Sequence, residues 1–232
     1  DVLVTVGSLA TSAMLAYEGT RALPLVFSMV LYPAASGFLG RPGRQVTGAS
    51  LDVSPDRQFQ TLRTLLPQAR RVGVLYSDAE TGGVVRAAEP DARRYGFEIV
   101  PASVDNPAAA LAALGELMDR VDAIWTVADS HVFTANTTSP LLLSTLRHRV
   151  PLFGLSFAQV RSGALVALAP DYAAVGRQTA EIAAKVVAGK PADSLPVATP
   201  DQVGLALNLR TAALLGVAVP PSLEASALEV VR

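Results

Sequence analysis

The feature that most limits what this chain can fold into is a regular alternation of short, continuously apolar segments with amphipathic ones. Residues 71–76 (RVGVLY) are apolar at nearly every position, which is typical of a strand buried on both faces of a parallel sheet. The segment ends at Ser77 and Asp78, and Gly82-Gly83 then leads into a helical pattern. Open α/β sheets bind ligands at such strand-to-helix turns, and the N–H groups at a helix start favour an anionic group.

The same alternation continues through the rest of the chain and predicts parallel sheets with helices on both faces. A helix from Pro55, capped by Ser54, and a long helix from about 172 to 188, ended by Gly189, are the clearest helical signals. Pro90 predicts a kink or an early end in the helix after Gly83, at a cost of ~3 kcal/mol if it is interior. The other predicted strands are 2–7, 24–31, 45–51, 97–102, 123–128, 151–156, 164–168 and 203–209.

Charge and composition exclude several classes of function. The 19 basic and 20 acidic residues give a net charge of −1, so we expect no nucleic-acid partner. No run reaches the roughly 18 apolar residues of a membrane-spanning helix. The chain has no cysteine, which excludes thiolate chemistry and disulfides. Because His131 and His148 are its two histidines, we also expect no metal site and no cofactor.

Catalytic signatures are missing from the sequence, which contains no GxGxxG, phosphate loop, GxSxG or HExxH. Ser8 follows Gly7 at a strand end, as a nucleophile does, but no recognisable motif supplies an activating histidine, so a ligand contact or a helix cap explains it better. His131 follows Asp129 closely and fits either a proton carrier or the wall of a crevice, the second being the simpler interpretation.

Polar residues gather where predicted strands end. Each of them singly could be a helix cap, but the carboxyl ends of parallel strands share one edge of a sheet, where a ligand crevice forms. As a set they therefore predict a small-molecule site. They are Ser8, Thr11, Ser77, Asp78, Asp129, Ser130 and Ser156.

A series of short segments carries a resemblance to a known family. The chain resembles the solute-binding proteins of ABC transporters with the type I periplasmic-binding fold, in the branch associated with tryptophan and tyrosine uptake. The resemblance covers essentially the whole chain, and the order and spacing of the segments are more specific than any one of them. The segments are VTVGS (4–8), PLVF (24–27), RPGRQVTG (41–48), RVGVLY (71–76), VDAIW (121–125), PLFG (151–154), DYAAVGRQTAE (171–181), NLRTA (208–212) and VPPSL (219–223).

The resemblance implies an α/β fold of two Rossmann-like lobes with parallel sheets, joined by a hinge of three crossover strands that closes on a ligand. The first lobe would hold residues 1–69 and about 171–198, and the second 70–170 and about 199–232. Family members carry two further βα units before the strand at 2–7. Together with a sequence that opens in mid-strand, this suggests that the first lobe is incomplete and that a natural N-terminal portion precedes Asp1.

The resemblance also implies a function. We expect an extracytoplasmic or periplasmic protein, with a lipid anchor as one option, that captures a small molecule between its lobes for an ABC permease. We expect a monomer when the protein is complete, and no catalysed reaction. Two alternatives stay open: a ligand-sensing domain of a signalling or transcription-regulatory protein, and a small α/β hydrolase acting at Ser8 or Asp129.

Departures from the family pattern affect the predicted ligand. Tyr32 and Phe157 stand where the family often has acidic residues, which leaves Asp129 as the expected partner for a cationic group. We therefore expect a flat or hydrophobic solute, amino-acid-like or aromatic, with an acceptor end and at most one cationic group. The full set of expected ligand-binding residues is Ser8, Thr11, Tyr32, Ser77, Asp78, Glu80, Thr81, Asp129, Ser130, Ser156, Phe157 and Asp171.

Overall fold

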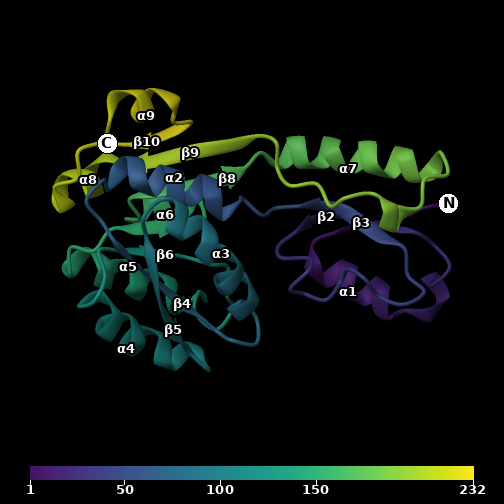
Figure 1. Cartoon of the computed structure of the whole chain (residues 1–232), viewed down its shortest axis with the longest axis horizontal. Helices are drawn as coiled ribbons and strands as arrows, with labels where there is room; N and C mark the ends of the chain where they lie inside the picture. The colour runs from purple at the N-terminus through teal and green to yellow at the C-terminus, as the bar shows by residue number, and fades with distance from the viewer. The chain divides into compact units, whose positions relative to one another are not determined.

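The computed structural model describes all 232 residues, which form two compact units (Figure 1). Residues 1–53 and 170–203 make up unit 1, and residues 54–169 and 204–232 make up unit 2. The chain therefore passes between the units after residues 53, 169 and 203. None of its helices combines the length and apolar character needed to cross a bilayer.

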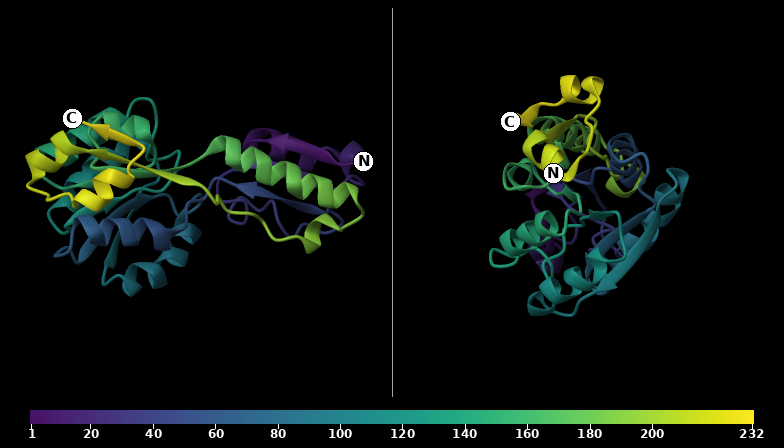
Figure 2. Two further views of the ribbon diagram at one scale, coloured as in Figure 1. Left: turned by 90° about the horizontal axis from the view of Figure 1, so that it is seen from above. Right: turned by 90° about the vertical axis from the view of Figure 1, so that its left-hand side faces the viewer.

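Unit 1 is built on a three-stranded parallel sheet in the order β1 (Leu3–Val6), β2 (Leu25–Val30) and β3 (Val46–Ser50). Helices α1 (Ser8–Ala16) and α7 (Tyr172–Val187) lie on opposite faces of this sheet (Figures 1 and 2). Alternate residues of β2 divide between the two faces, because Phe27 packs in the cluster with Leu15 of α1 while Val26 packs with Val175 of α7. Short 3₁₀ turns at Glu18–Thr20 and Ala192–Ser194 complete the unit.

Strand β1 forms one edge of this sheet. Its Thr5 is buried, whereas Val4 is 47% and Val6 is 63% exposed. Val4 lies beside Val26 of β2 in the strand register. It therefore belongs to the face of the sheet that α7 covers at Val26. An exposed apolar edge strand is a site where other chains can pair.

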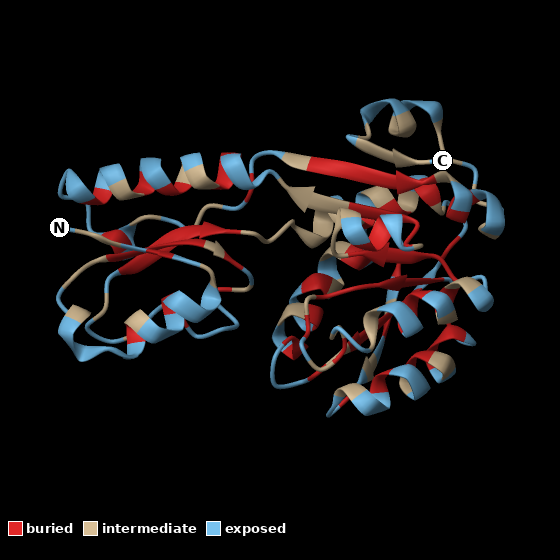
Figure 3. Ribbon diagram, turned by 180° about the vertical axis from the view of Figure 1, so that it is seen from behind, coloured by how far each residue is buried: buried red, intermediate tan, exposed pale blue.

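Unit 2 is built on a seven-stranded sheet in the order β10-β9-β8-β7-β6-β4-β5, with a hydrophobic cluster on each face (Figures 1 and 3). On β4, Val72 and Val74 join one cluster and Leu75 joins the other, which confirms a strand buried on both faces. The strands are β4 (Arg71–Tyr76), β5 (Glu98–Ser103), β6 (Ala123–Trp125), β7 (Leu152–Gly154), β8 (Val166–Pro170), β9 (Val203–Asn208) and β10 (Glu229–Val231).

Side-chain caps fix the starts of two helices of unit 2, and the first of these begins where the Ser54-Pro55 signal places it. Ser54 accepts a hydrogen bond from the Arg57 N–H and caps α2, and Asn106 caps α4 in the same way through Ala109. The helices are α2 (Pro55–Leu65), α3 (Gly82–Arg94), α4 (Pro107–Met118), α5 (Thr138–Arg147), α6 (Phe157–Arg161), α8 (Leu209–Leu215) and α9 (Pro221–Ser226).

The structure differs from the sequence expectations in several places. Helix α2 belongs to unit 2, not to a first lobe ending at residue 69, because Phe59 and Leu62 pack into the same cluster as Val72. Helix α3 continues through Pro90, whose position is exposed, while Ala88 on its buried face anchors the helix to the core. Strand β10 was not expected from the sequence.

Asp122 gives this fold a pH-dependent element at the start of β4. Its Oδ2 accepts hydrogen bonds from the backbone N–H groups of Arg70 and Arg71, both at 2.8 Å. Desolvation acts to raise the pKa of Asp122, but these hydrogen bonds and the two arginine charges outweigh it, so the pKa lies below its ordinary value of 3.8.

Replacing Asp122 with Asn should therefore lower the free energy of unfolding by ~1 kcal/mol at neutral pH, a modest amount because the group is exposed. A carboxyl with a depressed folded-state pKa stabilises above its unfolded pKa, and this stabilisation disappears as the pH falls through the folded value. The difference between Asp122→Asn and wild type should shrink below pH 3.8 in urea unfolding series. Asp119→Asn, at the end of α4, is the control, and an Asp122→Asn deficit that persists unchanged at low pH would contradict this account.

Candidate functional site

The strand order of unit 2 changes direction at β4. This strand lies between β5 and β6, so the chain leaves β4 toward one side of the sheet and later returns to the other side. The loops that follow β4 and β6 therefore diverge at the carboxyl edge of the sheet, which is where open α/β sheets form ligand crevices. Residues 77–81 and 126–131 occupy these two loops.

Asp129 ties the two loops together. Its Oδ2 accepts hydrogen bonds from Ser77 N at 2.7 Å, Ser77 Oγ at 2.8 Å and Thr81 Oγ1 at 2.5 Å. Its Oδ1 accepts from His131 N at 2.8 Å. Burial acts to raise the pKa of Asp129, but these four hydrogen bonds outweigh it and the pKa is lowered. The carboxylate is thus held as a buried anion, with both oxygens engaged inside the chain.

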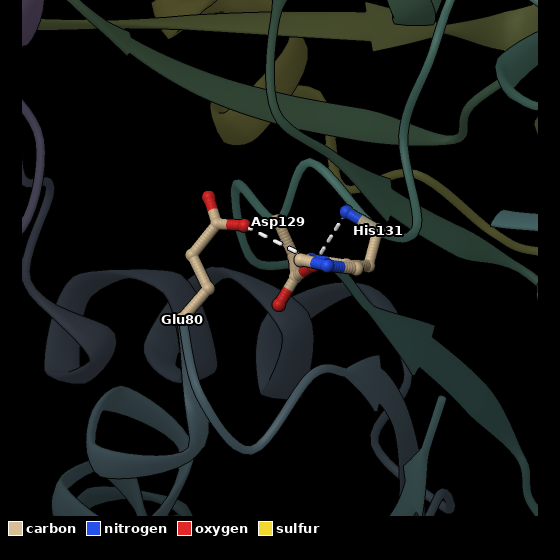
Figure 4. Close-up of side chains that lie close together, drawn as sticks. All are labelled: Glu80, Asp129 and His131. Carbon is tan, nitrogen blue, oxygen red and sulfur yellow. Dashed lines mark hydrogen bonds and ion pairs between the residues drawn. The ribbon is translucent and has the colours of Figure 1, made fainter. Parts of the chain in front are cut away.

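Glu80 and His131 lie directly beside Asp129 (Figure 4). Glu80 Oε2 accepts hydrogen bonds from Ser130 N at 3.0 Å and Ser130 Oγ at 2.7 Å, which forms a second link between the loops. The Nδ1 atom of His131 is 3.4 Å from Glu80 Oε2 and 3.7 Å from Asp129 Oδ1. The three side chains therefore form a compact group with one buried and one more exposed carboxylate.

The start of α3 adjoins this group. Asp78 pairs with Arg86 at 3.0 Å on the surface, and its carboxylate lies against Gly82 so closely that a Cβ at Gly82 would collide with it. A side chain at this first residue of α3 would require the exposed Asp78 carboxylate to move aside. The N–H groups of this first turn favour an acceptor or anionic group.

Ser156 and Phe157 follow β7 farther along the same sheet. The Ser156 hydroxyl accepts a hydrogen bond from Gln159 N and caps α6, so its side chain has a structural role. Phe157 is half-buried at the first position of α6, and its ring packs close to Gly204 of β9 at the edge of the core.

The candidates of unit 1 fall into two groups. Ser8 is exposed and begins α1; it does not cap the helix, because Gly7 with φ 83° occupies the cap position. Thr11 is fully buried and donates to Gly7 O, and Asp171 caps α7 by accepting from Ala174 N, so these two polar groups are engaged within the unit.

Tyr32 has a strained backbone, with φ at 50°, in the left-handed region that β-carbon-bearing residues rarely adopt. Its N–H donates to Asp52 Oδ1 at 2.9 Å, which helps to hold this conformation. Burial raises the pKa of Asp52, with the hydrogen bonds from Tyr32 and Ser50 opposing the shift. Sequence reasoning did not single out Asp52, because nothing local marks a carboxylate that acts on a residue in a different loop.

The structure therefore places Ser77, Glu80, Thr81, Asp129 and Ser130 in one hydrogen-bonded group, with Asp78 at its margin. Asp129 is not the open counter-charge that the sequence suggested, because its side chain is 0% exposed. His131 was considered from the sequence, but its position between two carboxylates was not anticipated.

The comparisons with known proteins agree with this architecture. The family model described as "ABC transporter substrate binding protein" matches residues 1–231. The chain belongs to this family. It is 26% identical over 203 residues to a tyrosine-binding protein of Clostridioides difficile, with 85% of this chain aligned. That alignment spans 58% of the relative, so the chain covers little more than half the length of the curated protein it matches.

Solved structures extend the likeness to the fold. An ABC domain from Streptococcus pneumoniae in complex with L-Trp has a TM-score of 0.79 at 22% identity, covering 100% of this chain and 79% of that one. A conserved domain protein from Vibrio cholerae has a TM-score of 0.79 at 26% identity, and the alignment covers 99% of this chain and 78% of that one. The predicted fold class, parallel α/β of the type I periplasmic-binding kind, is confirmed.

The link between the two loops can be tested through Thr81, which is fully buried. Thr81→Val removes the hydroxyl that donates to Asp129 and should lower the free energy of unfolding by ~1.5–3 kcal/mol, because the acceptor is charged. Urea denaturation of the purified chain measures the change.

Thr64→Val is the matched control, because Thr64 lies exposed on α2 and its hydroxyl bonds only the preceding helical turn through Gln60 O. It should change stability by no more than ~0.5 kcal/mol. Equal losses in the two variants would contradict the role given to the Thr81–Asp129 bond.

Proposed function

We propose that this chain is an extracytoplasmic solute-binding protein that captures a small amino-acid-like or aromatic solute and delivers it to an ABC permease. Membership of the substrate-binding family supports the role, since proteins of this family serve such transporters outside the cytoplasm. The observation that carries the proposal is the hydrogen-bonded group of Ser77, Glu80, Thr81, Asp129 and Ser130 at the point where the strand order reverses.

The chemistry of this group fits a solute with two polar ends. The first turn of α3 suits a carboxylate or another acceptor, because the first N–H groups of a helix have no partner within the helix, although that of Gly82 donates to Ser77 O. Glu80 is 38% exposed and carries the carboxylate that can meet a cationic group, in place of the enclosed Asp129. A free amino group pairs with such a carboxylate through a charge-assisted hydrogen bond.

The names of the relatives indicate which solutes to test first. One curated relative is a tyrosine-binding protein, and one similar structure contains L-Trp. An aromatic body also agrees with the half-buried ring of Phe157, one of the residues expected to bind the ligand. We therefore propose an aromatic amino acid or a close analogue as the solute.

We propose binding without catalysis. A hydrolase at Ser8 would need a base next to the hydroxyl. His131 lies instead beside two carboxylates in unit 2, and the Nδ1 of His148 lies 2.8 Å from the backbone oxygen of Ser144. A bound solute should accordingly be recovered unchanged, which mass spectrometry of the incubated mixture will determine.

The test is isothermal titration with L-tyrosine and L-tryptophan against wild type and Glu80→Gln. Losing one charge-assisted hydrogen bond costs ~1.5–3 kcal/mol, so Glu80→Gln should weaken binding about tenfold or more. Glu98→Gln is the control, because Glu98 is exposed at the opposite, amino end of β5 and should leave affinity unchanged.

A ligand without the amino group tests whether Glu80 pairs with that group. Indole-3-propionate has the ring and carboxylate of tryptophan without the amino group, so Glu80→Gln should not weaken its binding. No saturable binding of any aromatic amino acid, or conversion of the solute into a product, would overturn the proposed function. An equal effect of Glu80→Gln on both ligands would overturn the role of Glu80 alone.

A further inference from the structure

We propose that Glu80, Asp129 and His131 form a binding site for a divalent transition-metal cation of the zinc type. One ligand atom from each side chain lies within 4.8 Å of the other two (Figure 4). The set offers one imidazole nitrogen and two carboxylate oxygens, which are established zinc ligands. Glu80 is also the carboxylate assigned above to a solute's amino group, so the cation and that amino group are alternative partners for it. The inference does not rest on the identity of the solute.

The distances fit a zinc ion. Zinc bonded to nitrogen and oxygen at about 2.0–2.2 Å in a tetrahedron holds neighbouring ligand atoms about 3.3–3.6 Å apart. The Nδ1 of His131 is 3.4 Å from Glu80 Oε2 and 3.7 Å from Asp129 Oδ1, so two edges of the tetrahedron are already near this spacing. The third edge joins the two carboxylates, whose ligand oxygens lie within 4.8 Å of each other.

A separate observation concerns the imidazole itself. The Nδ1 atom of His131 is buried and makes no hydrogen bond, although the ring as a whole is 41% exposed. A buried polar nitrogen without a hydrogen bond is unfavourable, and native structures rarely leave one. This nitrogen faces the two carboxylates, and a cation bound among the three groups would satisfy it.

The surrounding hydrogen bonds hold the carboxylates in place for such a role. Asp129 is oriented by the N–H and hydroxyl groups of Ser77, the hydroxyl of Thr81 and the N–H of His131. Glu80 is oriented by Ser130. Metal-ligating carboxylates are typically hydrogen-bonded by neighbouring groups in this way, which fixes their direction and tunes the site.

The nitrogen donor selects the kind of cation. Calcium and magnesium prefer oxygen ligands, and magnesium also retains several waters, so neither explains an imidazole in the set. Zinc and its neighbours in the transition series accept mixed nitrogen and oxygen ligands. The proposal departs from the expectation, based on the number of histidines, that the chain holds no metal site, because the fold brings one of the two histidines beside two carboxylates.

The experiment uses the full chain, freed of any affinity tag and of metal, in calorimetric titration with zinc chloride. We expect saturable binding of one zinc ion per chain and an upward shift of the melting temperature. His131→Gln and Glu80→Gln should each weaken zinc binding by about tenfold or more. Cobalt(II) provides a spectroscopic probe, since a tetrahedral site gives visible absorption that His131→Gln should abolish.

His148→Gln is the matched control, because His148 is the other histidine and its ring contacts Ser144 on the surface. It should bind zinc as tightly as wild type. Asp129 is left intact in these variants, since its loss would disrupt both loops. No saturable zinc binding, or binding that His131→Gln leaves unchanged, would overturn the inference.

A titration of L-tryptophan in the presence of EDTA separates this inference from the proposed function. Solute binding in EDTA together with no zinc binding would overturn the metal site and leave the proposed function intact. Zinc binding without any solute binding would overturn the proposed function and leave the metal site intact.

Discussion

The organisation of unit 2 depends on one buried negative charge. Asp129 lies in a position from which solvent is excluded, and an ion there is stable only when hydrogen bonds compensate for lost hydration. The four donors that surround it come from the loop after β4 and from its own loop. Satisfying this charge therefore fixes how two strands that are adjacent in the sheet, but far apart in sequence, end at the same edge.

The fixed edge has consequences for the groups around it. Once Ser77 and Thr81 are engaged by Asp129, the loop between them presents Glu80 outward and toward Ser130. The backbone that follows enters α3 through Gly82, and the carboxylate of Asp78 lies close to this glycine. An enclosed carboxylate thus holds in place the loop that presents an accessible carboxylate at the same edge.

The sequence predicted the parts of this arrangement that depend on neighbouring residues. The apolar run at 71–76, the Ser54-Pro55 helix start and the glycine at 189 act locally, and each is confirmed in the structure. Some parts that depend on distant contacts were not predictable. Helix α2 was placed in the wrong unit because its partner Val72 lies beyond Pro67, and α3 passes through Pro90 because packing of its buried face outweighs a local preference.

Helix α7 supplies one face of the core of unit 1, packing Val175 and Ile182 against Val26 and Ala49. The strands it covers lie within residues 25–50, whereas the helix begins at Tyr172, with most of unit 2 encoded between them. During synthesis the ribosome therefore releases these strands long before the helix that covers them exists. Five of the seven strands of unit 2 precede α7 in the chain, and β9 and β10 follow it. Unit 1 can therefore complete its core only after most of the unit 2 sheet has been synthesised and before the last two strands of that sheet have.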